Sequence, residues 1–313
     1  MAEICSCTSG ITNFGQPPCV DSFSPDARLV FVQYYDNLGA VNSIASTDTL
    51  DSTFFEERIN AGNYSSLLDK SKRWYFTETI NSVEGERAES VKQEVDGISF
   101  NVKQGLRSYS GTFYGGIASP KYVGALRSLG CLQMGYFVID TNGAIIGQEY
   151  VDGAGDVFLN PIKMQRNTLD AIYKKPSKTE VQSIMLSFMV EENEKDETLS
   201  FIPSDDIAVD TLMLRSVAQV EGSVSTALAT TFTLVANYTY GTAFAKQPLV
   251  GLDNTTIKAY NVTTSSSILM SAAVESPDGT YLCTIPAQTT SDVISVDIDR
   301  AGYEMVTLTY VSL

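Results

Sequence analysis

Short apolar runs and alternating apolar and polar positions fill the first 205 residues, and they predict β-strands. β-Branched and aromatic residues dominate these runs, and turn-forming residues such as those at 36–39 close them. The predicted strands of this part lie at 28–35, 73–80, 98–102, 108–114, 135–140, 144–149, 169–173 and 181–190. We interpret 73–80, 98–102 and 108–114 as strands of one antiparallel sheet.

Two segments have the spacing and punctuation of helices. The first lies near 50–60, where Phe54, Phe55 and Ile59 recur at helical spacing behind Asp51 and Ser52, either of which could cap the helix. The second lies near 120–129. It begins with Ser119 as N-cap and Pro120 at the first helical position, and it ends at Gly130. Its spacing turns four side chains toward the sheet: Tyr122, Val123, Leu126 and Leu129.

A tight hairpin is predicted directly after the second helix. The runs 135–140 and 144–149 are joined by Thr141-Asn142-Gly143. Asn-Gly accepts the positive backbone angles that a short hairpin turn demands.

An acidic stretch at 191–197 separates two regions of different composition. Beyond Ser216 the chain has no Trp, few charges, and short Thr- and Val-rich strands at the spacing of a β-sandwich. These predicted strands lie at 230–240, 256–260, 268–274, 280–285, 293–298 and 305–311. Tyr281 precedes Cys283 by two residues, as in the tyrosine corner of immunoglobulin-like folds.

The fold class is therefore predicted to be mainly β, in two domains. Residues 1–208 would form an antiparallel β-sandwich or barrel-like domain with its two short helices. Residues 209–313 would form an immunoglobulin-like β-sandwich that folds alone.

Composition excludes several classes of function. The 313 residues are 43% hydrophobic and 19% charged, so the chain can bury a core. No apolar run approaches the roughly 20 residues that span a bilayer, and the N-terminus has no signal-peptide pattern, so we expect neither membrane insertion nor secretion. The net charge is −16 and basic residues are scattered, which argues against specific DNA binding.

Histidine is absent from the sequence. That absence removes Ser-His-Asp and Cys-His nucleophile systems and paired-His zinc motifs. Carboxylate chemistry stays open, with candidates in the acidic run (Glu191, Glu192, Glu194, Asp196 and Glu197) and in the pair Asp152 and Asp156. A solvated loop explains the run more simply, and a turn explains the pair.

Two further motifs have plain structural explanations. Asp140-Thr141-Asn142-Gly143 resembles the opening of a cation loop, but its hairpin role accounts for all four residues. The glycines of 111–116 lack the strand–loop–helix context of a nucleotide site and fit a strand end. We therefore assign no catalytic, cofactor-binding or metal-binding residue, and we expect no cofactor.

The five cysteines form no even disulfide framework. Cys5, Cys7 and Cys19 could offer three thiolates to a metal, but structural zinc requires four ligands. Whether these three bind metal, form a disulfide or stay free is open at this point.

The order of these elements resembles a family of phage proteins. The residues that carry the resemblance are Cys5-Ser6-Cys7-Thr8-Ser9-Gly10, Thr12-Asn13-Phe14-Gly15, Pro18-Cys19, Arg28 to Val32, the Ser119-Pro120 helix start and the Asn142-Gly143 hairpin. Over roughly the first 205 residues the chain is similar to tail tube or tail-barrel ring subunits of crAss-like bacteriophages of Bacteroides-type hosts. The last hundred resemble the immunoglobulin-like modules that phages append to virion proteins.

The resemblance implies a virion structural protein and no enzyme. Such a subunit would be made in the bacterial host cytoplasm and would assemble with itself into a cyclic homo-oligomer, twelve-fold or six-fold, next to neighbouring tail or portal-proximal proteins. DNA would pass through the channel without being specifically bound, and a negative subunit suits this because carboxylates repel phosphates. The aromatic residues of 73–80 and 108–114 would supply contact surfaces if they do not fill the core.

Two other classes remain as alternatives. One is a surface adhesion or carbohydrate-binding module built on the C-terminal sandwich. The other is a carboxylate hydrolase that uses Glu194 or Asp196. The missing signal peptide argues against the first, and the absence of histidine and of a paired-carboxylate motif argues against the second.

Overall fold

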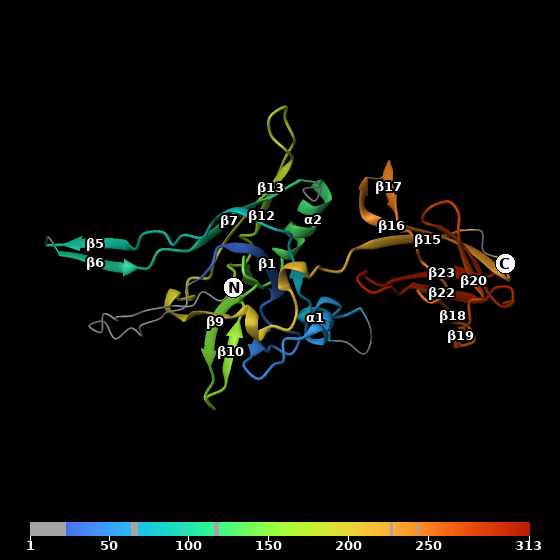
Figure 1. Cartoon of the computed structure of the whole chain (residues 1–313), viewed down its shortest axis with the longest axis horizontal. Coiled ribbons are helices and arrows are strands. Elements are labelled where there is room, and N and C mark those ends of the chain that lie inside the picture. The colour runs from blue at the N-terminus through green and yellow to red at the C-terminus, as the bar shows by residue number, and fades with distance from the viewer. Residues whose placement is uncertain (1–22, 64–67, 97, 116–118, 226–227, 243) are drawn as a thin grey trace.

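The computed structural model describes residues 23–63, 68–96, 98–115, 119–225, 228–242 and 244–313. The fold is mainly β, as predicted. Two β-rich bodies, the first with strands β1 to β14 and the second with β15 to β23, follow one another along the long axis of the molecule (Figure 1). One hairpin of the first body extends away from it. Among the described residues, no helix is long and apolar enough to cross a membrane.

An eight-stranded antiparallel sheet forms the centre of the first body. Its main path runs β2-β10-β9-β8-β1-β3, with β11 added on β8 and β14 on β9. The strands are β1 (Asp26–Gln33), β2 (Ile44–Ala45), β3 (Tyr75–Phe76), β8 (Met134–Asp140), β9 (Ile145–Val151), β10 (Val157–Asn160), β11 (Ile162–Lys163) and β14 (Leu199–Ile202).

A four-stranded sheet of order β12-β13-β7-β4 packs against one face of the eight-stranded sheet. Its strands are β4 (Asn81–Glu84), β7 (Ser108–Tyr114), β12 (Asp170–Lys174) and β13 (Ser183–Met189). Ile184, Leu186 and Phe188 of β13 turn into the shared core, while Met185 and Met189 are exposed. Helix α2 (Pro120–Leu129) closes this core with Val123 and Leu126.

The opposite face of the eight-stranded sheet is also covered. Helix α1 (Ser52–Ile59) packs Phe54, Phe55 and Ile59 there, together with Trp74. The central strands β1 and β8 are consequently buried on both faces, which explains their continuous apolar runs. Their register fixes which side chains enter which core, because Val30 pairs with Phe137 on one face and Leu29 pairs with Val138 on the other.

Both predicted helices and the predicted hairpin are confirmed. Asp51 caps α1 by accepting from Phe54 N, and Ser119 caps α2 by accepting from Tyr122 N. Between β8 and β9, Asp140 Oδ1 accepts from Asn142 N and Ala144 N, and Gly143 has φ +88°.

The prediction of a full strand at 73–80 is wrong. Only the two residues of β3 pair there, between the short 3-10 helix η2 (Lys70–Lys72) and β4. The segment is irregular because the Thr77 hydroxyl replaces a strand partner by accepting from Leu29 N at 3.0 Å. Nor do 73–80, 98–102 and 108–114 share a sheet, because β3, β6 and β7 belong to three different ones.

The idea that aromatic residues of 73–80 and 108–114 present contact surfaces is mostly wrong as well. Trp74, Phe76, Tyr109 and Phe113 are buried in the two cores, while Tyr114 is exposed. These rings fill the interior because they lie on strands and loops that face a sheet on one side and a helix or second sheet on the other.

The second body is a sandwich of two antiparallel sheets. One sheet has the order β15-β16-β21-β20, with β17 on β16, and the other has the order β19-β18-β22-β23. The strands are β15 (Val220–Ser225), β16 (Thr231–Thr242), β17 (Ala245–Pro248), β18 (Ile257–Asn261), β19 (Ser266–Ile268), β20 (Ala272–Glu275), β21 (Thr280–Thr284), β22 (Val293–Ile298) and β23 (Val306–Val311).

The predicted single strand at 268–274 is wrong, because the chain there leaves one sheet (β19) and enters the other (β20) with Met270 buried between them. The tyrosine-corner expectation has a structural counterpart: the buried Tyr281 hydroxyl donates to Leu249 O at 2.6 Å. Cys283 is buried in the same core as a free thiol.

The segment between the bodies continues the core of the first. It contains the 3-10 helices η4 (Ser204–Asp206) and η5 (Thr211–Met213), and Val217 is buried with the α1 core. Arg28 Nη1 donates to Leu212 O at 2.6 Å, and the Ser216 hydroxyl donates to Phe76 O at 3.1 Å. The division into residues 1–208 and 209–313 stays a prediction.

Candidate functional site

The acidic run cross-links the first body. Arg87 Nε lies 2.8 Å from Asp196 Oδ2, and Arg107 Nη2 pairs with the other oxygen of the same carboxylate. Arg87 Nη2 also donates to Glu194 O at 2.8 Å. Asp196 lies in the 3-10 helix η3 (Asp196–Thr198) and forms ion pairs with both Arg87 and Arg107. This is a structural role for its carboxylate.

Glu194 is partly buried within that run. Burial raises the pKa of its carboxyl, while the backbone N–H of Lys163, the Lys163 charge and the Arg107 charge oppose the rise. A hydrolase would need a second carboxylate across a cleft. Neither of the two pockets described below is lined by residues of the acidic run.

Asp152 and Asp156 lie in the turn between β9 and β10. Asp152 Oδ1 accepts from Ala154 N at 2.8 Å and from Asp156 N at 2.9 Å. One carboxylate oxygen therefore organises the turn.

Cys5, Cys7 and Cys19 lie outside the described residues. Within the described part of the chain, no group of three or more His, Cys, Asp or Glu side chains could hold a metal ion. Burial raises the pKa of the Cys283 thiol to about 12, so this thiol stays protonated at neutral pH.

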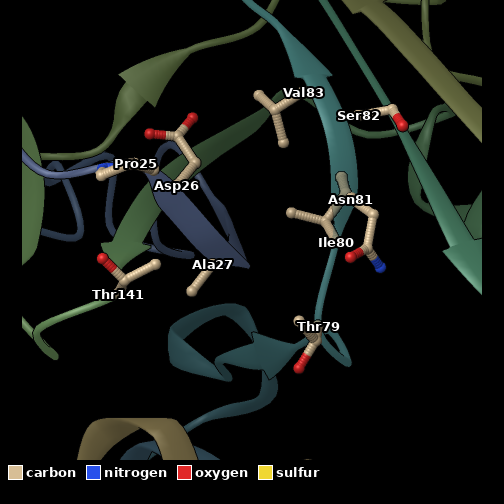
Figure 2. A pocket seen from close by; sticks show the side chains of 9 residues that line it. All are labelled: Pro25, Asp26, Ala27, Thr79, Ile80, Asn81, Ser82, Val83 and Thr141. Atoms are coloured by element: carbon tan, nitrogen blue, oxygen red, sulfur yellow. The ribbon is translucent and has the colours of Figure 1, made fainter.

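The larger pocket has a volume of about 560 Å³ and lies beside the start of β1. Figure 2 shows its lining, which comes from the entry into β1, the entry into β4 and the turn after β8. The lining residues are Pro25, Asp26, Ala27, Thr79, Ile80, Asn81, Ser82, Val83 and Thr141.

Asp26 is the only titratable side chain in that lining. The Tyr109 hydroxyl donates to Asp26 Oδ2 at 3.0 Å. Burial raises the pKa of the Asp26 carboxyl, the Tyr109 hydrogen bond opposes the rise, and the charge of Asp140 adds to it. A single carboxyl without a nucleophile or second carboxylate offers no complete catalytic arrangement.

The smaller pocket has a volume of about 160 Å³ and lies between α1 and the loop after β1. Its lining combines two cations, one carboxylate and one indole: Asp36, Ala40, Val41, Asn42, Ser43, Arg58, Leu68, Lys72 and Trp74. None of these residues was singled out from the sequence. Thirteen residues separate Arg58 from Lys72 in the sequence, and only the fold brings the pair together.

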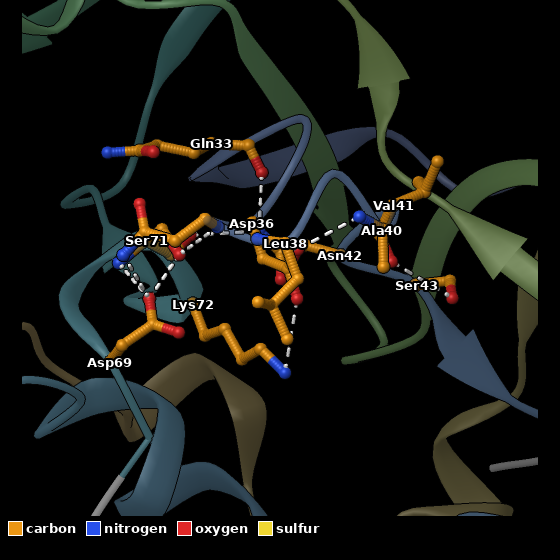
Figure 3. A network of polar contacts seen from close by, with 11 residues as sticks. Gln33, Asp36, Leu38, Ala40, Val41, Asn42, Ser43, Asp69, Ser71 and Lys72 are labelled. Atoms are coloured by element: carbon orange, nitrogen blue, oxygen red, sulfur yellow. Dashed lines mark hydrogen bonds and ion pairs between the residues drawn. The ribbon is translucent and has the colours of Figure 1, made fainter.

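A polar network holds one wall of this pocket in place (Figure 3). Asp36 Oδ1 accepts from Leu38 N at 2.9 Å and from Ala40 N at 2.8 Å, and Lys72 Nζ lies 3.3 Å from Asp36 Oδ2. Burial alone would raise the pKa of Asp36, but these N–H donors and the Lys72 ammonium together lower it. Asp36 is therefore ionised at neutral pH, and both of its carboxylate oxygens have partners.

A third feature is a protruding hairpin, the β-arm, formed by β5 (Val91–Val95) and β6 (Ile98–Lys103). Figure 1 shows it extending away from the first body. Within the described residues, its two strands pair only with each other. The side chains of Val91 and Ile98 are 56% and 59% exposed.

No protein-family model matches the chain, and a search of curated proteins finds no match. The fold and these surfaces therefore carry the functional argument.

Proposed function

We propose that the chain is a structural subunit of a bacteriophage tail that assembles with copies of itself into a ring around the DNA exit channel. The observation that carries this proposal is the β-arm. A two-stranded hairpin is marginal in water by itself, and unpaired strand edges with exposed apolar side chains invite pairing with another chain. The arm is therefore suited to a contact between subunits.

Charge supports the same proposal. A subunit with net charge −16 repels the phosphates of DNA in a channel, so DNA can pass without adhering. The two packed cores of the first body form the scaffold that carries the arm. Twelve-fold and six-fold rings are the proposed stoichiometries, and they rest on the resemblance given above.

The direct test is a reconstruction of a virion that contains the chain. We expect its density in a tail ring or tube, with the β-arm against a neighbouring subunit. Absence of the chain from every ring and tube of the particle would contradict the proposal. Glycan binding by the isolated chain would instead favour the adhesion alternative.

A variant separates assembly from folding. Ile98→Asp places a charge on the exposed arm, so its thermal midpoint should match that of the unmodified protein while ring incorporation falls. Leu269→Asp is the matched control, because Leu269 is an 85% exposed apolar residue of the sandwich. Equal incorporation of both variants would remove the β-arm from the assembly contact.

A further inference from the structure

Arg58 differs from the other buried arginines of the first body in having few partners. Arg28 donates from Nε to Thr77 O at 2.7 Å and from Nη1 to Leu212 O at 2.6 Å. Arg73 donates from Nε to Ala61 O and from Nη2 to Asn63 Oδ1, each at 2.7 Å. Backbone and side-chain oxygens thus satisfy both of these guanidinium groups.

The contacts of Arg58 are weaker within the described residues. Nη1 donates to Phe54 O at 3.3 Å, and Nη2 lies 4.0 Å from Asp48 Oδ2, the limit for an ion pair. Its guanidinium carbon lies 3.3 Å from the centre of the Phe54 ring, so an aromatic ring covers one face of the group. These are the acceptors of Arg58 among the described residues, and 18% of the side chain is exposed.

Burial has a cost for such a cation. It lowers the pKa of the Arg58 guanidinium to about 10, against the attraction of Asp48 and Glu57. The group still carries its charge at neutral pH, so its hydrogen-bonding demand persists. A partly buried charge with only weak partners is unfavourable, and an anion placed beside it would reduce that cost.

The smaller pocket, which Arg58 lines, supplies space and further donors. Lys72 and Ser43 line the same volume of about 160 Å³. Trp74 also lines it and is 2% exposed. The one carboxylate of the wall, Asp36, is already engaged by Lys72 and two backbone N–H groups.

We propose that this pocket binds a small carboxylate. The remaining N–H groups of the Arg58 guanidinium would donate hydrogen bonds to its oxygens. The planar fork of a guanidinium matches the two oxygens of a carboxylate. Lys72 adds positive charge, and the Ser43 hydroxyl adds a neutral donor. A doubly charged phosphate fits less well, because Asp36 in the wall repels the second negative charge. This inference does not depend on the assembly proposed above.

Fluorescence offers a direct test, because Trp74 is the only tryptophan of the chain. Acetate is titrated into the full-length protein at constant ionic strength, with chloride as the balancing anion. We expect a saturable change in Trp74 emission with acetate and a weaker response to inorganic phosphate.

Two substitutions assign the change to the pocket. Arg58→Met keeps most of the side-chain stem and removes the donors, so the affinity for acetate should fall by about tenfold or more. Arg127→Met is the matched control, because Arg127 lies on the exposed side of α2, and it should leave the affinity unchanged. Lys72→Met provides a second test on a partly exposed residue and should weaken binding without unfolding the chain.

Three results would overturn the proposal: no saturable response to acetate, a response that phosphate gives and acetate does not, or full affinity in Arg58→Met. The source of the carboxylate is distinguished by a second titration with N-acetylglutamate amide. Tighter binding of this blocked residue than of acetate identifies an acidic side chain of another chain as the ligand. Equal or weaker binding identifies a free organic acid.

Discussion

Arg73 of the first body and Glu304 of the second form an ion pair across the junction between the two bodies. Arg73 Nη1 lies 3.2 Å from Glu304 Oε1, and the Arg73 side chain is only 2% exposed. Lys70 Nζ contacts the same carboxylate oxygen at 3.1 Å. Beside the pair, Ala218 N donates to Gly302 O and Glu304 N donates to Ala218 O. The junction therefore has a polar contact with a buried charge at its centre.

Glu304→Gln should destabilise the protein by about 1 to 3 kcal/mol, because it leaves the Arg73 cation buried without its counter-charge. Calorimetry should show one transition in the unmodified protein and two in the variant, as the bodies uncouple. Glu221→Gln is the control, since the Glu221–Lys246 pair is about half exposed and should contribute less than about 1 kcal/mol. Identical thermograms for all three proteins would refute a coupling role for Glu304.

Acid should weaken the same contact. Burial by itself would raise the pKa of Glu304, but Lys70 and Arg73 lower it below its usual value. The stability that Glu304 contributes is therefore present above its unfolded-state pKa and is lost as the pH falls through the folded-state value. The stability difference between the unmodified protein and Glu304→Gln should shrink between pH 7 and pH values below about 4. A difference that grows on acidification would contradict this assignment.

Asp26→Asn should stabilise the protein at neutral pH. Because burial raises the pKa of Asp26, its ionised form opposes folding, and stability is lost as the pH rises through the folded-state pKa. Asparagine cannot ionise and still offers Oδ1 to the Tyr109 hydroxyl. Denaturant unfolding should show the advantage of the variant increasing from about pH 4 to pH 7. A constant advantage over this range would mean that Asp26 does not titrate on folding.

Leu126→Ala should lower the free energy of unfolding by about 2 to 5 kcal/mol, because Leu126 is buried between α2 and the core of the two sheets. Denaturant midpoints measure the loss. Arg127 is the next residue of the same helix and lies on its exposed face. Arg127→Ala should therefore change stability by about 0.5 kcal/mol or less. An unchanged midpoint for Leu126→Ala would show that α2 does not contribute to the core.

Gly105→Ala should open the base of the β-arm. A Cβ at Gly105 would clash with the backbone oxygen of Ala88, which cannot move without separating the two arm strands. We expect a cost of about 1 to 3 kcal/mol, with faster hydrogen exchange confined to 88–106. Gly153→Ala, which meets open space, is the control. Faster exchange in β7 and β13 as well would show that the arm is part of the body's cooperative unit.

Local sequence patterns predicted correctly the helix and the hairpin turn whose formation depends on neighbouring residues. Ser119 and Gly130 bound α2, and Asn142-Gly143 forms the hairpin turn, because caps and turns depend on residues within a few positions of each other. One failure fell where a tertiary contact overrides propensity. The aromatic run from Arg73 to Ile80 has the pattern of a strand, yet after β3 the Thr77 hydroxyl takes the place of a strand partner for Leu29 N.

By itself the sequence determined a mainly β chain with two short helices, an acidic surface and no histidine chemistry, because composition and periodicity act along the chain. Only the tertiary structure decided that β1 and β8 are covered on both faces, that the β-arm stands apart, and that Arg73 meets Glu304. The pocket around Arg58, Lys72 and Trp74 belongs to this second group. Charge pairing and pocket formation depend on distances in space between residues far apart in the chain, and no local pattern encodes those distances.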